Sequence, residues 1–97
     1  MTQIHVTARF RVRSGSADQA IPILTEMTSH ARAEPGCIDY GYFRQTDDAD
    51  AFTSIEVWAS AADEAAHNGT DFLSDAVSRL RPFLDGRPHV TRYCRIA

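Results

Sequence analysis

Residues 3–13 read QIHVTARFRVR, and apolar and polar side chains alternate along the whole stretch. The apolar positions are Ile4, Val6, Ala8, Phe10 and Val12. Successive side chains of a β-strand point to opposite faces, so this period of two predicts a strand with one apolar face. The elements that follow the strand decide how its two faces are covered.

A helix is predicted next. Residues 14–16 break the strand, and apolar side chains recur at helical spacing over residues 20–31, which predicts one buried stripe. Pro22 lacks a backbone N–H, so the helix either starts near Asp18 or kinks at the proline. The Glu-Pro-Gly sequence at residues 34–36 ends the helix, because the residue before proline avoids helical angles and glycine permits the turn.

The rest of the chain predicts three more strands and two more helices. Residues 37–45 and 51–59 predict a pair of strands joined by a polar loop, and Ser60 predicts the cap of a short helix that ends near Asn68. The remaining predicted elements are a longer helix over residues 70–84, weakened near its end by Pro82, and a strand over residues 89–96.

The order of these elements is that of a split βαβ motif. We therefore predict an α+β, ferredoxin-like fold with a four-stranded antiparallel sheet and its helices on one face, as a single domain over residues 1–97. We expect the apolar side chains of residues 4–10 on one face of the sheet and Phe52 and Trp58 on the other. The helices would leave one apolar face uncovered, which predicts a homodimer with the two sheets packed face to face. The expected inter-sheet residues are Val6, Ala8, Phe10, Ile55 and Val57.

The composition disfavours several classes of function. Ten Arg and no Lys stand against 13 acidic residues, and the net charge of −3 disfavours nucleic-acid binding. A chain without Lys has no Schiff-base or P-loop lysine. The sequence has no run of 18 apolar residues and no signal-peptide pattern, so we expect a cytoplasmic protein without a membrane partner. Motifs of nucleotide cofactors, catalytic triads and zinc hydrolases are also absent from the sequence.

A set of short motifs resembles a known family. The motifs are Gly15, Glu34-Pro35-Gly36-Cys37 with Tyr40, Glu56-Val57-Trp58, Ala66-His67, and Phe72. Over roughly residues 3–84 the chain is similar to the antibiotic biosynthesis monooxygenase (ABM) domain of the dimeric α/β-barrel superfamily. The resemblance implies a pocket between the sheet and the helices of each subunit. The family includes cofactor-free oxygenases of anthrones and quinols, haem-degrading enzymes and small-molecule isomerases, so the resemblance alone does not select a reaction.

Five side chains are candidates for the implied pocket. His67 is the candidate catalytic acid or base, because imidazole titrates near neutral pH, and Trp58 is expected to stack on a planar substrate. Thr7, Tyr40 and Phe72 are expected on the substrate-binding wall. Each has a structural alternative: His67 can cap the helix carboxyl end, and the aromatic side chains can be core residues.

Glu56 is predicted to be buried, and a buried carboxylate needs a partner. The strand arginines Arg9, Arg44 and Arg92 are the expected partners, which favours a structural role for Glu56 over that of a catalytic base.

These inferences predict a cofactor-independent monooxygenase that acts on a small aromatic substrate (a quinol, an anthrone or a polyketide-like molecule) with dioxygen, and that binds no metal, flavin or haem. The haem-degrading relatives use an amide on the first strand, whereas the only Asn of this chain is Asn68. The alternatives are an isomerase of a small carbonyl compound and a non-catalytic dimeric module that binds small molecules.

Overall fold

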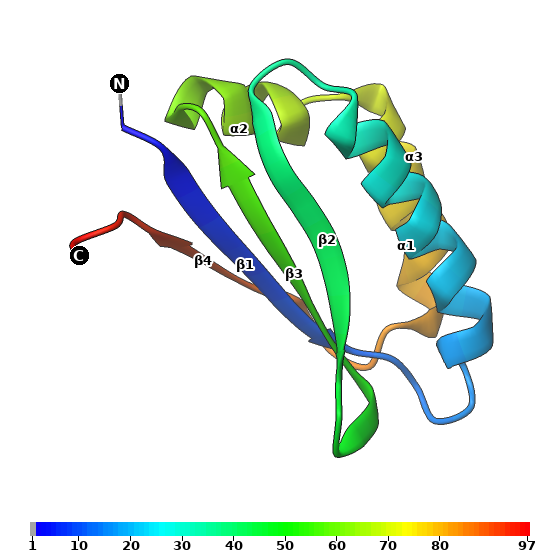
Figure 1. Ribbon diagram of the computed structural model, residues 1–97. Coiled ribbons are helices and arrows are strands. Elements are labelled where there is room, and N and C mark those ends of the chain that lie inside the picture. Colours follow the sequence, from blue (N-terminus) through cyan, green and yellow to red (C-terminus); the bar gives the residue numbers. More distant parts are fainter. Residues whose placement is uncertain (1) are drawn as a thin grey trace.

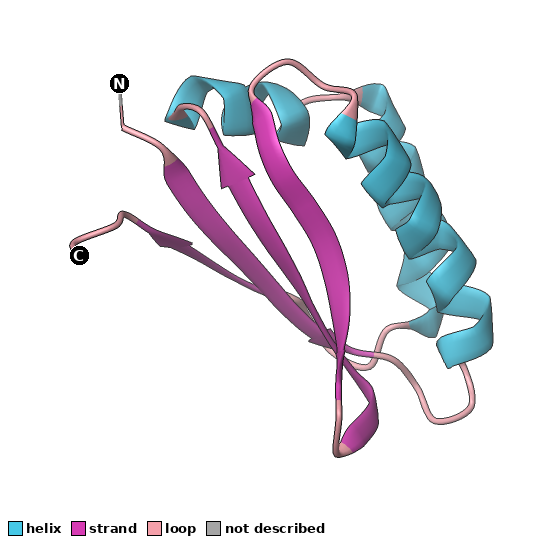
Figure 2. Ribbon diagram, viewed as in Figure 1, coloured by secondary structure: helices cyan, strands magenta, loops and turns pink. Residues whose placement is uncertain are grey.

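The computed structural model describes residues 2–97 and forms one antiparallel sheet with helices beside it (Figure 1). In chain order the elements are β1 (Ile4–Arg11), α1 (Ala17–Arg32), β2 (Cys37–Gln45), β3 (Asp48–Trp58), α2 (Ala61–Asn68), α3 (Asp71–Leu80), the 3₁₀-helix η1 (Arg81–Phe83) and β4 (His89–Tyr93). The strands lie in the order β2-β3-β1-β4. The helices lie on one side of the sheet (Figure 2), which confirms the predicted ferredoxin-like fold. No helix among the described residues combines the length and the apolar character needed to span a membrane.

Local sequence signals set most of the helix ends. α1 starts at Ala17, close to the predicted Asp18, and runs through Pro22. The hydroxyls of Ser60 and Thr70 each accept a backbone N–H from the first turn of α2 and α3, at 3.2 Å in both cases. α3 ends at Leu80 and continues only as the 3₁₀-turn that contains Pro82. The prediction that this proline weakens the end of the helix is therefore confirmed.

Two strands differ in length from the prediction. β3 begins at Asp48 rather than near residue 51, because Asp48 pairs with Gln45 and leaves a short turn in place of the longer polar loop. β4 ends at Tyr93 rather than near residue 96, and its first residue, His89, pairs with Arg9 of β1. The polar residues of the β2–β3 hairpin are compatible with a strand because they lie at the exposed tip.

The predicted assignment of the two sheet faces is wrong. Ile4 pairs directly with Trp58 and Phe10 with Phe52, and directly opposed residues of antiparallel strands share a face. The apolar side chains of β1 and the buried residues of β3 therefore point to the same side, toward the helices. Val6, Ala8 and Phe10 lie on this inner face and are not available to contact a second sheet. Val6 and Phe10 are buried.

The outer face of the sheet carries a different set of side chains. Ile55, Phe43 and Tyr93 are 45%, 56% and 51% exposed, and Ile55 pairs with Thr7 across β1 and β3. Val57, the other predicted inter-sheet residue, also lies on this face, next to His5. Of the five residues predicted between two sheets, only Ile55 and Val57 are therefore on the uncovered face.

Two hydrophobic clusters connect the sheet to the helices. The larger one lies between the inner face, α1 and α3, and includes Phe10, Leu24, Phe52 and Leu80. The smaller one consists of Val6, Ala31, Tyr40 and Trp58. A cavity lies over the inner face of the sheet and is lined by members of both clusters.

Candidate functional site

The cavity has a volume of about 290 Å³ and two chemically different ends. Its apolar wall comes from the sheet, α1 and α3 and includes Phe10, Met27, Leu73, Val77, Leu80 and Val90. Its polar residues are Tyr40, Tyr42, Glu56, Glu64, His67, Asn68 and Arg92. An apolar cavity with a few polar groups at one end is typical of a site for a small organic molecule.

His67 is the histidine that lines this cavity. It lies in the last turn of α2, and its side chain is only 5% exposed. Its ring centroid lies 4.6 Å from that of Trp58 and 5.5 Å from that of Tyr40. Its Nδ1 lies 2.9 Å from Oε1 and 3.2 Å from Oε2 of Glu34. The predicted neighbourhood of His67 and Trp58 is therefore present in the structure.

The Glu-Pro-Gly turn after α1 places Glu34 beside α2. Gly36 has a φ of 80°, a conformation that side-chain-bearing residues rarely adopt, and a Cβ there would collide with the side chain of Asp63 in α2. The N–H of Ala59 donates to the carbonyl of Gly36 at 2.8 Å and ties the turn to the end of β3. This close approach of turn and helix explains how Glu34 reaches a histidine 33 residues away in sequence.

Glu34 also contacts a second histidine. Oε1 of Glu34 lies 3.3 Å from Nδ1 of His30, one helical turn earlier on α1. The His30 ring is stacked parallel on Phe72 with centroids 3.8 Å apart. Phe72, a predicted substrate-binding residue, therefore packs against α1 and does not line the cavity. Its neighbour Leu73 lines the cavity instead, because residues adjacent on a helix face different directions.

Tyr40 and Tyr42 form a pair of phenols on the inner face of β2. Their hydroxyl oxygens lie 2.9 Å apart, and the Tyr42 hydroxyl also points to the sulfur of Met27 at 3.8 Å. Burial raises the pKa of Tyr42 to about 12 and raises the pKa of Tyr40 further, because a phenolate is poorly solvated inside the protein. Both side chains are neutral phenols at neutral pH, and the O–H that is not used within the pair can donate a hydrogen bond to a ligand oxygen.

Glu56 is buried, as predicted, but its partners are not arginines. Its Oε1 accepts from the indole N–H of Trp58 at 3.0 Å, and its Oε2 accepts from the hydroxyl of Ser54 at 2.8 Å. These residues alternate along β3, so one strand supplies the carboxylate and both donors on its inner face. Trp58 is fully buried and does not line the cavity. Its indole ring packs instead beside the His67 ring, with the two ring planes tilted by 34°.

Arg92 pairs with Glu64 instead of Glu56. Its guanidinium reaches from β4 to the carboxylate on α2 with N–O distances of 2.8 to 3.0 Å, and Asn68 donates to the same carboxylate at 2.9 Å. The hydrogen bonds from Arg92 lower the pKa of Glu64. Glu64 and Arg92 both line the cavity, so the ion pair forms part of its wall.

Thr7 lies outside the candidate site. It belongs to the outer face of β1, where its hydroxyl is 3.5 Å from that of Tyr93. The alternation of the strand that places Val6 and Ala8 in the cavity lining necessarily turns Thr7 away from it. Thr7, a predicted substrate-binding residue, therefore does not share a cavity with His67.

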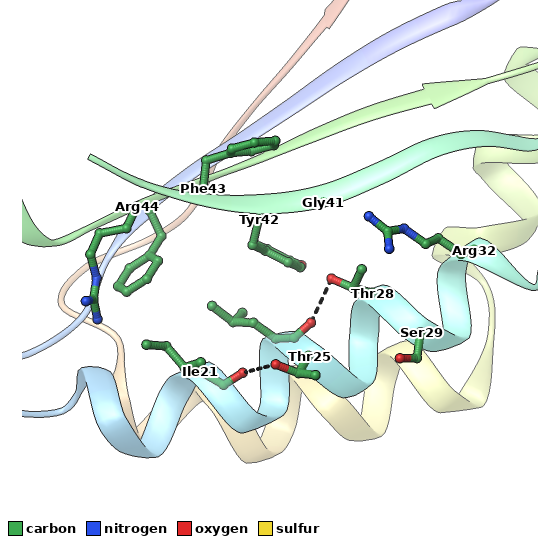
Figure 3. Close-up of a pocket in the computed structure, with 11 residues that line it drawn as sticks. Ile21, Thr25, Thr28, Ser29, Arg32, Gly41, Tyr42, Phe43 and Arg44 are labelled. Atoms are coloured by element: carbon green, nitrogen blue, oxygen red, sulfur yellow. Dashed lines mark hydrogen bonds between the residues drawn. The ribbon is translucent and has the colours of Figure 1, made fainter. Parts of the chain in front are cut away.

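A larger groove of about 550 Å³ lies between α1 and the edge strand β2. Figure 3 shows that it has Arg32 and Arg44 at its two ends. Arg32 donates to the carbonyl of Tyr40 at 2.9 Å, and Arg44 lies over the ring of Phe52. No acidic residue or histidine lines this groove in the described chain, and its hydroxyls at Thr25 and Thr28 already donate to helix carbonyls. Apart from the Tyr42 phenol, which also lines the cavity, the described groove offers no group with a pKa suited to proton transfer near neutral pH.

The sequence did not point to Glu34 as a member of the site. The signal available for it was the four-residue spacing from His30, which places the two side chains on one helix face. Nothing in the sequence indicated the contact with His67. The described residues contain no group of three or more His, Cys, Asp and Glu side chains arranged to hold a metal ion.

Comparison with known proteins gives both a family and a relative. Residues 3–79 match the family described as antibiotic biosynthesis monooxygenase. An uncharacterised protein from Synechocystis sp. (strain ATCC 27184 / PCC 6803 / Kazusa) is 26% identical over 94 residues. The match covers 97% of this chain but only 63% of that protein.

Solved structures share the fold. A protein from Caulobacter crescentus CB15, described as a proposed antibiotic biosynthesis monooxygenase, superposes with a TM-score of 0.93 at 23% sequence identity. The match covers 99% of this chain and 92% of the Caulobacter chain. A conserved protein of unknown function from Bacteroides thetaiotaomicron VPI-5482, described as a possible oxidoreductase, gives a TM-score of 0.88 at 24% identity, with 97% and 98% covered. At these identities the likeness concerns the fold alone.

Proposed function

Because this chain belongs to the antibiotic biosynthesis monooxygenase family, we propose that it is a cofactor-independent monooxygenase of a small aromatic phenol or quinol. The observation that carries the proposal is His67, a buried imidazole that lines a mostly apolar cavity and is held through Nδ1 by Glu34. A base in such a cavity can remove a phenolic proton where little water competes for it.

The proposed first step is a proton transfer. With Nδ1–H donated to Glu34, the free Nε2 of a neutral His67 accepts the hydroxyl proton of the substrate. The raised pKa values keep Tyr40 and Tyr42 protonated, and the hydrogen bond between them uses one of their two O–H groups. The other O–H, which points to the sulfur of Met27, can turn to the resulting oxyanion. The cavity thus offers one base and one neutral donor.

The proposed second step uses dioxygen as the oxidant. The electron-rich anion gives up electrons to dioxygen and forms a carbon–oxygen bond, and the resulting peroxide takes back a proton from the His67 imidazolium. Loss of one water molecule then leaves a ketone or quinone. One oxygen atom of dioxygen enters the product and the other leaves as water, so atoms and electrons balance without a further reductant.

The size of the cavity supports a compact substrate. Small-molecule sites usually have volumes of ~300–1,000 Å³, and the value of about 290 Å³ is at the lower end of that range. One or two fused rings suit this space better than the larger ring systems of polyketides. The polar end at His67 suits a hydroxyl group, and the wall of Phe10 and Leu80 suits the hydrocarbon part.

A second copy of the chain is the proposed partner. Ile55, Phe43 and Tyr93 expose apolar surface on the outer face of the sheet, and a face-to-face dimer would bury it. Sedimentation at micromolar concentration tests this proposal, with a dimer as the expected species. Ile55→Asp should give a folded monomer, because a dimer would bury an unpaired charge at that position. A monomeric wild-type protein would contradict the proposal.

Labelled dioxygen tests the monooxygenase proposal. Purified protein is mixed with naphthols, quinols and anthrones under ¹⁸O₂, and oxygen uptake and product mass are measured. The expected result is uptake that depends on protein, with one labelled atom in the product. If a substrate is converted without oxygen uptake, the chain is an isomerase or another non-oxygenase member of the family. If no compound is converted or bound, the proposal is wrong for this class of substrate.

A further inference from the structure

We propose that His67, Glu34 and His30 act as one unit. Glu34 is the positioning residue that fixes the tautomer of His67. The protonation of His30 controls how strongly the Glu34 carboxylate stabilises a positive charge on His67. This inference deepens the proposed function, because it concerns the regulation of the base in the same cavity. It rests on the contacts of one carboxylate with two imidazoles.

The first part of the argument concerns the orientation of His67. A carboxylate oxygen at 2.9 Å from Nδ1 requires that nitrogen to carry the hydrogen, since the carboxylate can only accept. The neutral ring then has its lone pair on Nε2. His67 lines the cavity and Glu34 does not, so the nitrogen not held by Glu34 is the one left for a ligand. A carboxylate that holds a histidine in this way also stabilises the imidazolium formed when the base accepts a proton.

The second part concerns His30. Its Nδ1 lies 3.3 Å from Oε1 of Glu34, the same oxygen that is nearest to His67. The side chain of His30 is 40% exposed, compared with 13% for Glu34 and 5% for His67. His30 can therefore exchange protons with solvent while His67 is enclosed. A proton on His30 places a positive charge next to Glu34 and weakens the hold of Glu34 on the His67 imidazolium.

Other charged and titratable groups face His67 from the surrounding elements. Glu64 lies on its own helix, Tyr40 on β2, Glu56 on β3 and Arg92 on β4. Glu64 is already paired with Arg92, and Glu56 is satisfied by Ser54 and Trp58. Glu34 is the carboxylate that makes a direct hydrogen bond to the His67 ring, and His30 is the titratable neighbour of that carboxylate on the solvent side.

Nitrogen NMR of the wild-type protein tests the tautomer without any substrate. The chain has four histidines, and ¹⁵N spectra show which ring nitrogen of each carries a proton. The expected result at pH 7.5 is a His67 ring with hydrogen on Nδ1 and none on Nε2. In Glu34→Gln the amide can donate as well as accept, so a mixture of tautomers is expected. A wild-type His67 ring protonated on Nε2 alone would overturn the proposal whatever reaction the protein catalyses.

The pH dependence of the rate tests the coupling. Glu34→Gln should lower kcat by at least about 10²-fold, because the tautomer and the countercharge are both lost, and should move the pH–rate profile to lower pH. His30→Phe keeps the ring that stacks on Phe72 but removes the nitrogen. It should leave the high-pH plateau unchanged and move the profile to higher pH, so that the rate at pH 6 falls about threefold.

The opposite directions of the two shifts separate electrostatic control from a structural role. His89→Gln is the matched control, because His89 is an exposed histidine on β4, outside the cavity, and should change neither the profile nor the NMR spectrum of His67. Profiles of Glu34→Gln and His30→Phe that coincide with that of the wild type would refute the coupling. If the wild type has no oxygenase activity but the NMR result is as expected, the proposed function fails while the assignment of Glu34 stands.

Discussion

The groove between α1 and β2 is larger than the cavity over the inner face of the sheet, but the cavity has more side chains suited to acid–base chemistry. The groove is larger, at about 550 Å³ against 290 Å³. Its polar groups are two arginines and several hydroxyls, of which Thr25 and Thr28 donate within their own helix. The cavity contains a histidine, two phenols and two carboxylates that are held by defined partners. Volume alone would select the groove, which lacks the histidine on which the proposed function rests.

The physical difference between the two regions is the depth of their polar groups. His67 and Glu56 are 4% and 7% exposed, so their charges and hydrogen bonds act in a medium of low dielectric constant. Thr25, Ser29 and Arg44 in the groove are exposed, and water weakens their interactions. A comparison of substitutions in the two regions can therefore confirm or refute the choice of site.

The largest expected difference between the regions is in stability. Trp58→Ala should lower the free energy of unfolding by about 3–5 kcal/mol, because it empties a fully buried site and removes the N–H donor to Glu56. Ile21→Ala at the partly exposed rim of the groove should cost less than about 1 kcal/mol. Urea unfolding measures both values. Equal effects would mean that the two regions are equally well packed, contrary to the structure.

The next difference is in catalysis. His67→Ala should lower the oxygenation rate by about 10²-fold or more, because no other group of the cavity is placed as a free imidazole. Thr25→Ala in the groove should leave the rate unchanged. Both are measured as oxygen uptake with the best substrate of the screen. Full activity of His67→Ala with an unaltered pH profile would transfer the role of base to Glu56 or a tyrosine of the cavity.

A smaller difference is expected in ligand affinity. Val77→Phe adds bulk to the cavity wall on α3 and should weaken naphthol binding about tenfold or more, because the ligand and the new ring compete for one space. Ser29→Phe adds the same bulk at the groove and should have no effect on binding. Calorimetry on anaerobic protein measures the two dissociation constants. Weaker binding only in Ser29→Phe would identify the groove as the ligand site.

The smallest expected effect concerns the dependence of stability on pH. The pKa of Glu64 lies below its usual 4.5 in the folded protein, so the Arg92 pair stabilises the fold above that pH and loses this contribution as the pH falls through the lower, folded-state pKa. Glu64→Gln should cost on the order of 1 kcal/mol at pH 7 and less at pH 3.

Arg44→Gln in the groove is the control for this prediction, because Arg44 makes no ion pair among residues 2–97. Its effect on the free energy of unfolding should be the same at both pH values. A cost of Glu64→Gln that grows as the pH is lowered would show that the carboxylate is not stabilised by Arg92.

Much of the fold was available from local sequence pattern. The alternation of residues 3–13, the helical stripe that ends at Glu34-Pro35-Gly36 and the cap at Ser60 each act over a few residues, so they predict elements and their order. The family resemblance, rather than this local pattern, predicted that His67 and Trp58 belong to one region, and their ring centroids lie 4.6 Å apart. Their spacing of nine residues across a strand end and a short helix limits how far apart they can lie.

The errors occurred where two distant strands had to be placed relative to each other. Alternation shows that Val6 and Thr7 face opposite sides, but not which side receives the helices. The pairing of Ile4 with Trp58 and Phe10 with Phe52 decides that question, and it sends Thr7 outward. In the same way, the stripe of α3 contains both Phe72 and Leu73, and only packing against α1 selects Leu73 for the cavity.

By itself, the sequence determined the order of the elements, and its motifs indicated the family. These depend on residue types and on contacts between neighbours in the chain. The tertiary structure alone decided the partners of the charged groups: Glu34 for His67, Trp58 and Ser54 for Glu56, and Glu64 for Arg92. The reason is geometric, because hydrogen bonds require distances near 3 Å, and a chain pattern does not fix distances between segments that meet only when the sheet and helices pack together.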